Sequence, residues 1–281
     1  MKKLALIAGS ILLLLSSCTT IEIKEHDLFD VKRTIRPQTF SSMPYELDEL
    51  TITTPDSISL QAWFVENPGA EKTVLYFGGN GFVIETGYNI ITSIVEQNVN
   101  LLVFNYRGYG RNSGSPSIDG FQKDGLAAYD YLIHQRKVDP RNIILHGHSL
   151  GSFLAAYTAN QRKCGALVLQ SPVTDMEDWT KTAIPWFLRA IFKFEVDRTL
   201  VENSNLKQIG KIEVPIFIVS GKEDKITPPV LAEKLYEAAT NTPKKEFLIV
   251  EGAGHNDLPE KNAYTQALCK FYTSQTSTVL Q

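Results

Sequence analysis

One stretch of the sequence indicates the fold most clearly: Asn142-Ile143-Ile144-Leu145-His146-Gly147-His148-Ser149-Leu150-Gly151-Ser152-Phe153-Leu154-Ala155-Ala156. It begins with a short apolar run typical of a buried strand and ends with small residues that suit a helix. Between them, Gly-His-Ser-Leu-Gly predicts a sharp turn, because flanking glycines let the strand and helix approach without Cβ clashes. Such a turn pushes the Ser149 hydroxyl out from the carboxyl end of a sheet. Ser149 is therefore the first candidate for a reactive residue.

The start of the chain has the features of an export signal. Two lysines precede an apolar run over residues 4–15, which is shorter than the ~20 residues needed to span a bilayer. The sequence Leu15-Ser16-Ser17-Cys18 resembles the lipobox of bacterial lipoproteins, which implies cleavage before Cys18 and lipidation of that residue. Thr19, where Asp would favour the inner membrane, implies the outer membrane of a cell envelope. An ordinary signal peptide or a short anchor is the alternative.

Three parts follow from this interpretation: a signal peptide over residues 1–17, a lipidated tether and lead-in over 18–44, and one globular domain over 45–281. The net charge of −3, with no basic block, argues against a nucleic-acid partner. After Cys18 only Cys164 and Cys269 remain, so neither a disulfide framework nor a metal cluster is expected. An exported protein could bridge these two cysteines. Two buried free thiols are the simpler expectation.

The globular part alternates strand and helix patterns. Residues 49–54 and 58–65 alternate apolar and polar positions around a turn, which predicts an antiparallel hairpin. Buried strands are expected at 73–77, 100–105, in the apolar run before Ser149, and at 166–170, 214–220 and 247–250, with helices at 84–97, 119–135, after Ser149, and at 257–274. This order predicts right-handed crossovers and a mostly parallel sheet flanked by helices. Ligands of such sheets bind beyond the carboxyl ends of the strands.

A serine hydroxyl needs a base to become a nucleophile, and an imidazole suits that role near neutral pH. Of five histidines, His26 falls in the tether and His134 in a helix. We expect His146 and His148 to point away from Ser149, because they lie two and one positions before it. His255 remains, in a glycine-containing loop just after the last strand. We predict that this loop folds back toward Ser149.

The imidazole also needs a carboxylate that holds its tautomer. Asp224 follows the strand that ends near Ser220, and Glu223 is the alternative beside it. Asp257 lies only two positions from His255 and is better suited to capping the last helix.

The chain order Ser149, Asp224, His255 is that of the α/β-hydrolase triad, and the chain resembles that superfamily over nearly all residues after Cys18. It looks closest to compact serine hydrolases with a His-Gly-Asn-Ala loop and a Tyr-Arg-Gly-Tyr-Gly segment. Their counterparts here are Gly78-Gly79-Asn80-Gly81, with glycine in place of histidine, and Tyr106-Arg107-Gly108-Tyr109-Gly110. We expect the second segment to be a scaffold, with Arg107 bound to nearby carbonyls or acids.

The resemblance implies an oxyanion hole with two hydrogen-bond donors. We expect one from the N–H of Leu150 and the other from Asn80, with Gly79 as the alternative.

A short cap-like segment is expected over residues 172–212, because it has no clear place in the sheet. It is rich in large apolar side chains, including Trp179, Trp186 and Phe187, and could form one or two helices over Ser149. We expect part of this surface to be core and the rest to line an acyl pocket or face a membrane.

These observations predict a serine hydrolase of the carboxylesterase or thioesterase kind, lipid-anchored in a bacterial envelope. Its substrate would be a small ester or thioester, such as a lipid-derived one, and neither a metal nor an organic cofactor is implied. The alternatives are a serine peptidase and a lipoprotein that keeps the fold only to bind a lipid or a protein.

Overall fold

The computed structural model describes residues 20–31, 45–183, 187–188 and 192–274. The predicted signal peptide, the lipidation site Cys18 and the cap residue Trp186 lie outside these ranges. Within them, no helix combines the length and the apolar character that crossing a bilayer requires.

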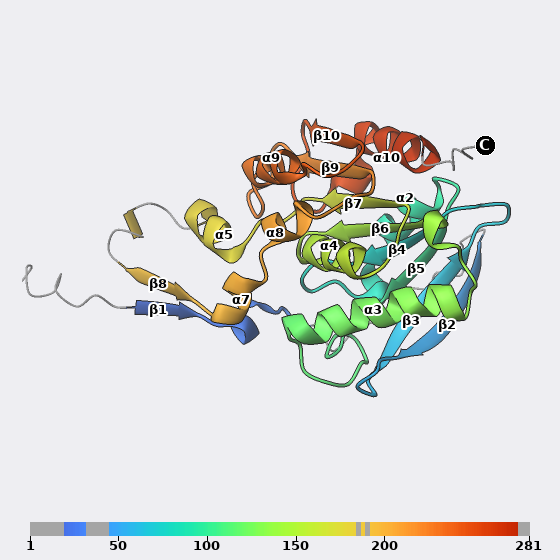
Figure 1. The fold of residues 1–281 in the computed structure, drawn as a ribbon, viewed down its shortest axis with the longest axis horizontal. Helices are drawn as coiled ribbons and strands as arrows, with labels where there is room; N and C mark the ends of the chain where they lie inside the picture. Colours follow the sequence, from blue (N-terminus) through green and yellow to red (C-terminus); the bar gives the residue numbers. More distant parts are fainter. Residues whose placement is uncertain (1–19, 32–44, 184–186, 189–191, 275–281) are drawn as a thin grey trace, which may run out of the picture.

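An eight-stranded sheet forms the centre of the molecule (Figure 1). In spatial order its strands are β10 (Lys245–Val250), β9 (Ile216–Gly221), β7 (Ala166–Gln170), β6 (Ile143–His148), β4 (Thr73–Phe77), β5 (Asn100–Phe104), β3 (Ser59–Glu66) and β2 (Glu46–Thr53). Strand β3 pairs antiparallel with both β2 and β5, and the remaining pairs are parallel. The α/β-hydrolase fold, the hairpin and the mostly parallel sheet are therefore confirmed.

Helices cover both faces of the sheet. One face is packed by α3 (Ile118–His134), α4 (Leu150–Gln161), α8 (Asn205–Ile209) and α9 (Pro229–Ala238), and the other by α2 (Tyr88–Val95) and α10 (Asn262–Ser274). Single turns of 3-10 helix lie at η1 (Glu25–Leu28), η2 (Ile84–Thr86), η3 (Pro140–Asn142) and η4 (Leu258–Glu260). Strands β4, β6 and β7 are almost wholly buried, as strands covered on both faces must be.

Two helical details differ from the sequence prediction. The helix expected from residue 84 begins as η2, and α2 starts only at Tyr88. Helix α9 was not predicted, although Pro229 stands at its first turn and Leu231 and Leu235 share its buried face. Proline at the start and leucines four apart are the signal that would have identified it.

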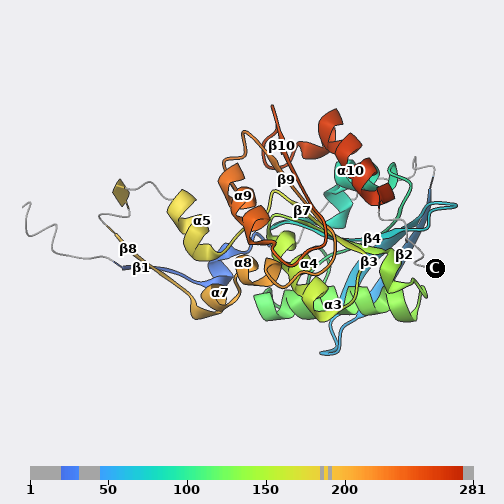
Figure 2. The same cartoon turned by 45° about the horizontal axis from the view of Figure 1, so that its top comes forward.

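A second, two-stranded sheet lies beside the domain, where β1 (Thr20–Ile23) runs parallel to β8 (Lys193–Val196), as Figures 1 and 2 both show. The backbone N–H of Asp197 continues this contact by donating to the Ile23 carbonyl over 2.9 Å. We expected residues 18–44 to be a lipidated tether and a lead-in to the fold, and residues 20–31 of this segment contact the cap-like segment through β1. No local pattern predicts β1, because the strand is mostly exposed and its partner lies far along the chain.

The cap-like segment contains α5 (Met176–Ala183), β8, α7 (Arg198–Glu202) and α8 in its described part. It is therefore more than the one or two helices expected.

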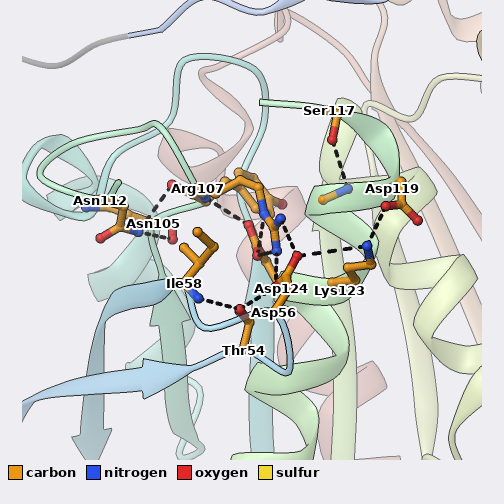
Figure 3. A network of polar contacts seen from close by, with 12 residues as sticks. Thr54, Asp56, Ile58, Asn105, Arg107, Asn112, Ser117, Asp119, Lys123 and Asp124 are labelled. Atoms are coloured by element: carbon orange, nitrogen blue, oxygen red, sulfur yellow. Dashed lines mark hydrogen bonds and ion pairs between the residues drawn. The ribbon is translucent and has the colours of Figure 1, made fainter. Parts of the chain in front are cut away.

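The Tyr106–Gly110 segment is a scaffold, as predicted, and Arg107 is its central residue (Figure 3). The guanidinium donates to Asp124 from Nε and Nη2 over 2.9 and 2.7 Å, and to Asp56 from Nη1 over 2.8 Å. Asp124 lies on α3 and Asp56 in the turn between β2 and β3. The hydrogen bond from Arg107 holds the pKa of Asp56 well below its usual range. Arg107 thus joins the sheet edge to α3 and takes no part in either cavity described below.

The thiols of Cys164 and Cys269 are both free; Cys164 is buried, as expected, whereas Cys269 is only half-buried.

Candidate active site

Ser149 occupies a strained turn between β6 and α4. Its backbone has φ 52° and ψ −118°, a left-handed conformation that costs energy in a residue with a side chain. The two glycines of the motif permit this turn. A Cβ at Gly147 would overlap the Gly151 carbonyl, and a Cβ at Gly151 would overlap the Phe77 carbonyl. The Ser149 N–H donates to the Gln170 carbonyl over 2.9 Å, which ties the turn to β7.

Asp224 and His255 form a hydrogen-bonded pair. The Nδ1 of His255 lies 2.8 Å from Asp224 Oδ2, and the Asp224 side chain is fully buried. Its Oδ1 accepts from the backbone N–H groups of Ile226 and Thr227 over 2.9 and 2.8 Å, and its Oδ2 accepts from the Thr227 hydroxyl over 2.9 Å. Burial alone would raise the Asp224 pKa, but the hydrogen bonds and the charge of His255 outweigh it, so the pKa is lowered. Asp224 is therefore an ionised acceptor that holds a proton on His255 Nδ1.

Glu223, the alternative carboxylate, has an exposed side chain. Its backbone N–H donates to the Ala253 carbonyl over 2.9 Å, which joins this turn to the His255 loop. The geometry therefore brings Asp224, and not Glu223, to the imidazole.

The His255 loop is held by two contacts that sequence reasoning missed. Asp257 does not cap the last helix; its Oδ1 accepts from the Gly254 N–H over 2.6 Å. His148 was expected to point elsewhere, yet its Nε2 donates to the His255 carbonyl over 3.1 Å and its ring centroid lies 4.9 Å from that of His255. Burial, followed by the charge of nearby His255, lowers the His148 pKa to about 4, so His148 is neutral.

The proposed oxyanion loop lies against Ser149. A Cβ at Gly79 would stand only 3.3 Å from Ser149 Cβ. Leu150 is the first residue of α4, and the N–H groups of a first helical turn have no acceptor within the helix. In place of the histidine found in similar proteins, Gly78 adjoins the Phe82 ring, which any side chain at position 78 would overlap. The Tyr106 hydroxyl fixes the loop by donating to the Gly78 carbonyl over 3.0 Å.

The side chain of Asn80 is already engaged. Its Nδ2 donates to the Leu28 carbonyl over 2.6 Å, and its Oδ1 accepts from the Asp30 N–H and the Tyr109 hydroxyl, each over 2.9 Å. Asn80 thus clamps the N-terminal segment over residues 20–31 onto the domain. Only backbone N–H groups of this loop remain for an oxyanion.

An apolar cavity of about 390 Å³ opens on one side of Ser149. Nine of its lining side chains are hydrophobic: Leu28, Phe29, Ile118, Leu150, Phe153, Val173, Trp179, Leu200 and Ile226. They come from the N-terminal segment, α3, α4, the cap-like segment and the loop between β9 and α9. Trp179 and Leu200 show that the cap-like segment does line a pocket beside Ser149, while Leu28 and Phe29 were not anticipated.

A polar cavity of about 590 Å³ opens on the other side. Ser149, Asn80 and Ile226 border both cavities, whereas His255 and His148 border only the polar one. Its other lining residues are Tyr76, Gly79, Gly81, Phe82, Thr86, Gly87, Tyr88, Asn89, Ile90, Gln170, Asn256 and Pro259. None of the residues that line it is Asp, Glu, Lys or Arg.

The family model that matches the chain is that of the prolyl oligopeptidase family, over residues 92–277. An uncharacterized protein of Mycobacterium tuberculosis is 31% identical over 242 residues, which cover 84% of this chain and 83% of that protein. Protein bem46 of Schizosaccharomyces pombe is 31% identical over 244 residues, covering 84% of this chain and 78% of that protein.

Solved structures of two esterases share the fold. Esterase Pf2001 of Pyrococcus furiosus superposes with a TM-score of 0.71 at 20% identity, covering 87% of this chain and 96% of that one. The acetyl xylan esterase of Paenibacillus sp. R4 has a TM-score of 0.66 at 17% identity, covering 84% and 86%. At these identities the likeness concerns the fold alone.

Proposed function

The chain belongs to the prolyl oligopeptidase family of α/β-hydrolases, and from this premise we propose that it is a serine hydrolase that cleaves a carboxylic ester or thioester through an acyl-enzyme. The observation that carries the proposal is the Asp224–His255 hydrogen bond of 2.8 Å at a cavity that Ser149 also borders. A buried ionised carboxylate, an oriented imidazole and a strained serine form the set of groups that nucleophilic acyl transfer requires.

In this proposal the Ser149 Oγ attacks the substrate carbonyl carbon, and His255 Nε2 accepts the hydroxyl proton. Asp224 keeps the other proton on Nδ1 and stabilises the imidazolium that forms. The resulting oxyanion accepts hydrogen bonds from the Leu150 N–H and from a backbone N–H of Gly79 or Asn80; one such donor is typically worth ~3–4 kcal/mol. The C–O or C–S bond then breaks as His255 protonates the leaving group. Water then attacks the acyl-enzyme in a second, equivalent step and releases the carboxylic acid.

The two cavities orient the substrate. His255 must reach the leaving atom, and His255 borders the polar cavity only. The leaving group therefore belongs in the polar cavity, and the acyl chain in the apolar cavity. Each methylene buried there would contribute ~0.8 kcal/mol, so a short or medium acyl chain should be preferred to acetate.

A peptidase is the second candidate, since the family is named for one. The apolar cavity argues against it, because nine hydrophobic side chains offer few partners to the amide groups of a peptide, and a buried amide without a hydrogen bond is costly.

We also propose a lipid anchor at Cys18 in a bacterial envelope. Strand β1 starts at Thr20, directly after the lipobox, and the same N-terminal segment supplies Leu28 and Phe29 to the apolar cavity. This continuity favours a lipid-derived substrate. A palmitate analogue should label the wild type and not Cys18→Ser; a soluble, unlabelled wild-type product would contradict the anchor.

The test of the activity is labelling with a fluorophosphonate, followed by turnover assays. Wild type should be labelled once and should hydrolyse p-nitrophenyl butyrate faster than a matched peptide p-nitroanilide, and Ser149→Ala should lose both label and turnover. Persistent label on Ser149→Ala would place the nucleophile elsewhere. An unlabelled, inactive but folded wild type would support a binding lipoprotein, and faster anilide cleavage would support a peptidase.

A further inference from the structure

The floor of the polar cavity is a buried network of polar side chains. His146 Nδ1 lies 2.8 Å from the Tyr272 hydroxyl, and His146 Nε2 lies 3.2 Å from Gln170 Oε1. The Tyr264 hydroxyl donates to the same Oε1 over 2.9 Å. Burial lowers the His146 pKa to about 3, so the ring is neutral and has one N–H. With Oε1 as acceptor, that proton is on Nε2, and Tyr272 donates to Nδ1.

This network turns Gln170 in one direction. Its Oε1 accepts from His146 Nε2 and from the Tyr264 hydroxyl, which leaves the Nε2 amide as the group that can donate into the polar cavity. Gln170 is only 2% exposed and lines that cavity together with Ser149. No hydrogen bond engages Nε2 in the described part of the chain.

Tyr76 adds a second polar group to this floor. It lines the same cavity and is 2% exposed, with its ring packed edge-on against Phe82 and His146. Burial raises the pKa of its hydroxyl, which therefore stays neutral and can donate or accept. Among the described residues no side chain or carbonyl is hydrogen-bonded to it. A buried hydroxyl of this kind is costly unless something in the cavity satisfies it.

His148 provides a third polar group at this cavity. Because its neutral ring donates from Nε2 to the His255 carbonyl, its Nδ1 is an acceptor. A Cβ at Gly79 would lie 2.9 Å from that Nδ1, so Nδ1 faces the loop beside Ser149. The cavity thus presents an amide donor, a hydroxyl and an imidazole acceptor, with no charged side chain around them.

We propose that the polar cavity selects a neutral, polyhydroxylated leaving group, such as the glyceryl part of a polyol ester, and that Tyr76 and Gln170 are its recognition residues. This inference rests on the proposed acyl transfer at Ser149. Hydroxyl groups both donate and accept, so a leaving group that carries them can hydrogen-bond to the amide donor of Gln170, the hydroxyl of Tyr76 and the acceptor of His148. A phosphate or carboxylate on the leaving group would meet no cation there. An alkyl leaving group would leave all three polar groups without partners. A site built to hydrogen-bond a hydroxyl strongly rejects a substrate that lacks it.

The test compares two esters with the same octanoyl group, 2,3-dihydroxypropyl octanoate and propyl octanoate, which differ only by two hydroxyls. We expect wild-type kcat/KM to favour the dihydroxypropyl ester by more than tenfold. Tyr76→Phe removes one oxygen and should lower that ratio about fivefold, and Gln170→Leu should lower it similarly. The matched control is Tyr129→Phe, because the Tyr129 hydroxyl donates to the Lys163 carbonyl away from both cavities; its ratio should equal that of wild type.

Hydrolysis of p-nitrophenyl octanoate separates two kinds of failure. A wild type that cleaves it but shows a ratio near one overturns this inference and leaves the proposed function standing. A wild type that cleaves neither it nor the alkyl esters overturns both. A high ratio that Tyr76→Phe does not change, in a variant with unaltered thermal unfolding, also overturns the inference, because recognition then lies elsewhere.

Discussion

The two cavities that meet at Ser149 differ in origin as well as in polarity. The apolar cavity is walled by helices and loops outside the sheet: the N-terminal segment, the start of α3, the start of α4, the cap-like segment and the loop after β9. The polar cavity has its floor in the sheet itself, where Tyr76 on β4 and Gln170 on β7 flank the Ser149 strand. A change in the apolar wall leaves the strands intact, whereas a change in the polar floor alters the strands themselves. The acyl preference should therefore be the more easily altered of the two.

The greatest loss of activity should follow from changes to the Asp224–His255 pair, because this pair acts on both halves of the substrate. Asp224→Asn would place the wrong tautomer on His255 and should lower kcat by about 10⁴, whereas Glu223→Gln should change kcat less than twofold because that side chain is exposed. Since one imidazole serves both halves of the substrate, the loss should be the same for every ester tested. Steady-state kinetics on a panel of esters would measure it. The opposite ranking of the two variants would show that Glu223 is the functional carboxylate.

A smaller effect, on the preference for acyl-chain length, should arise from the apolar cavity alone. Leu200 lines the apolar cavity, while its neighbour Val201 on α7 is 45% exposed. Leu200→Ala removes apolar contact worth roughly 2 kcal/mol, so kcat/KM for octanoate should fall by more than tenfold relative to acetate. Val201→Ala should leave the octanoate-to-acetate ratio unchanged. If both variants alter the ratio equally, the cap-like segment acts through general stability and not as an acyl wall.

The last effect is on the free energy of unfolding, and it concerns the buried His146 network under the polar cavity. His146 is fully buried and its pKa is about 3 in the folded state, against about 6.5 in an unfolded chain. Between these values the unfolded chain binds the extra proton, so the free energy of unfolding should fall by about 1 kcal/mol per pH unit on acidification. His146→Gln should remove this contribution to the slope and leave that of His148, whose pKa burial also lowers, whereas Leu200→Ala should remove neither. Urea unfolding between pH 6.5 and 4 would measure both, and equal slopes in wild type and His146→Gln would refute the neutral network.

The site residues that could be predicted are those marked by a local sequence pattern. Ser149, Asp224 and His255 each follow a buried strand, so their meeting at one sheet edge could be predicted from strand order. Gln170 and Tyr76 carry no such signal, because a polar residue at a strand end is common and only the packing of α10 makes them a floor. Strand β1 was missed for a related reason, since its partner β8 lies far along the chain. His148 was misjudged because the position of a side chain in a turn was inferred from spacing alone.

We expect the acyl and alcohol halves of the substrate to bind in two independent cavities that meet at Ser149. This independence is tested by measuring kcat/KM for four esters, acetyl or octanoyl joined to propyl or 2,3-dihydroxypropyl, with wild type, Leu200→Ala and Tyr76→Phe. We expect Leu200→Ala to lower the octanoyl-to-acetyl ratio by the same factor for both alcohols. We expect Tyr76→Phe to lower the dihydroxypropyl-to-propyl ratio by the same factor for both acyl groups. A Leu200→Ala variant that changes the alcohol ratio, or a Tyr76→Phe variant that changes the acyl ratio, would show that the two cavities are not independent.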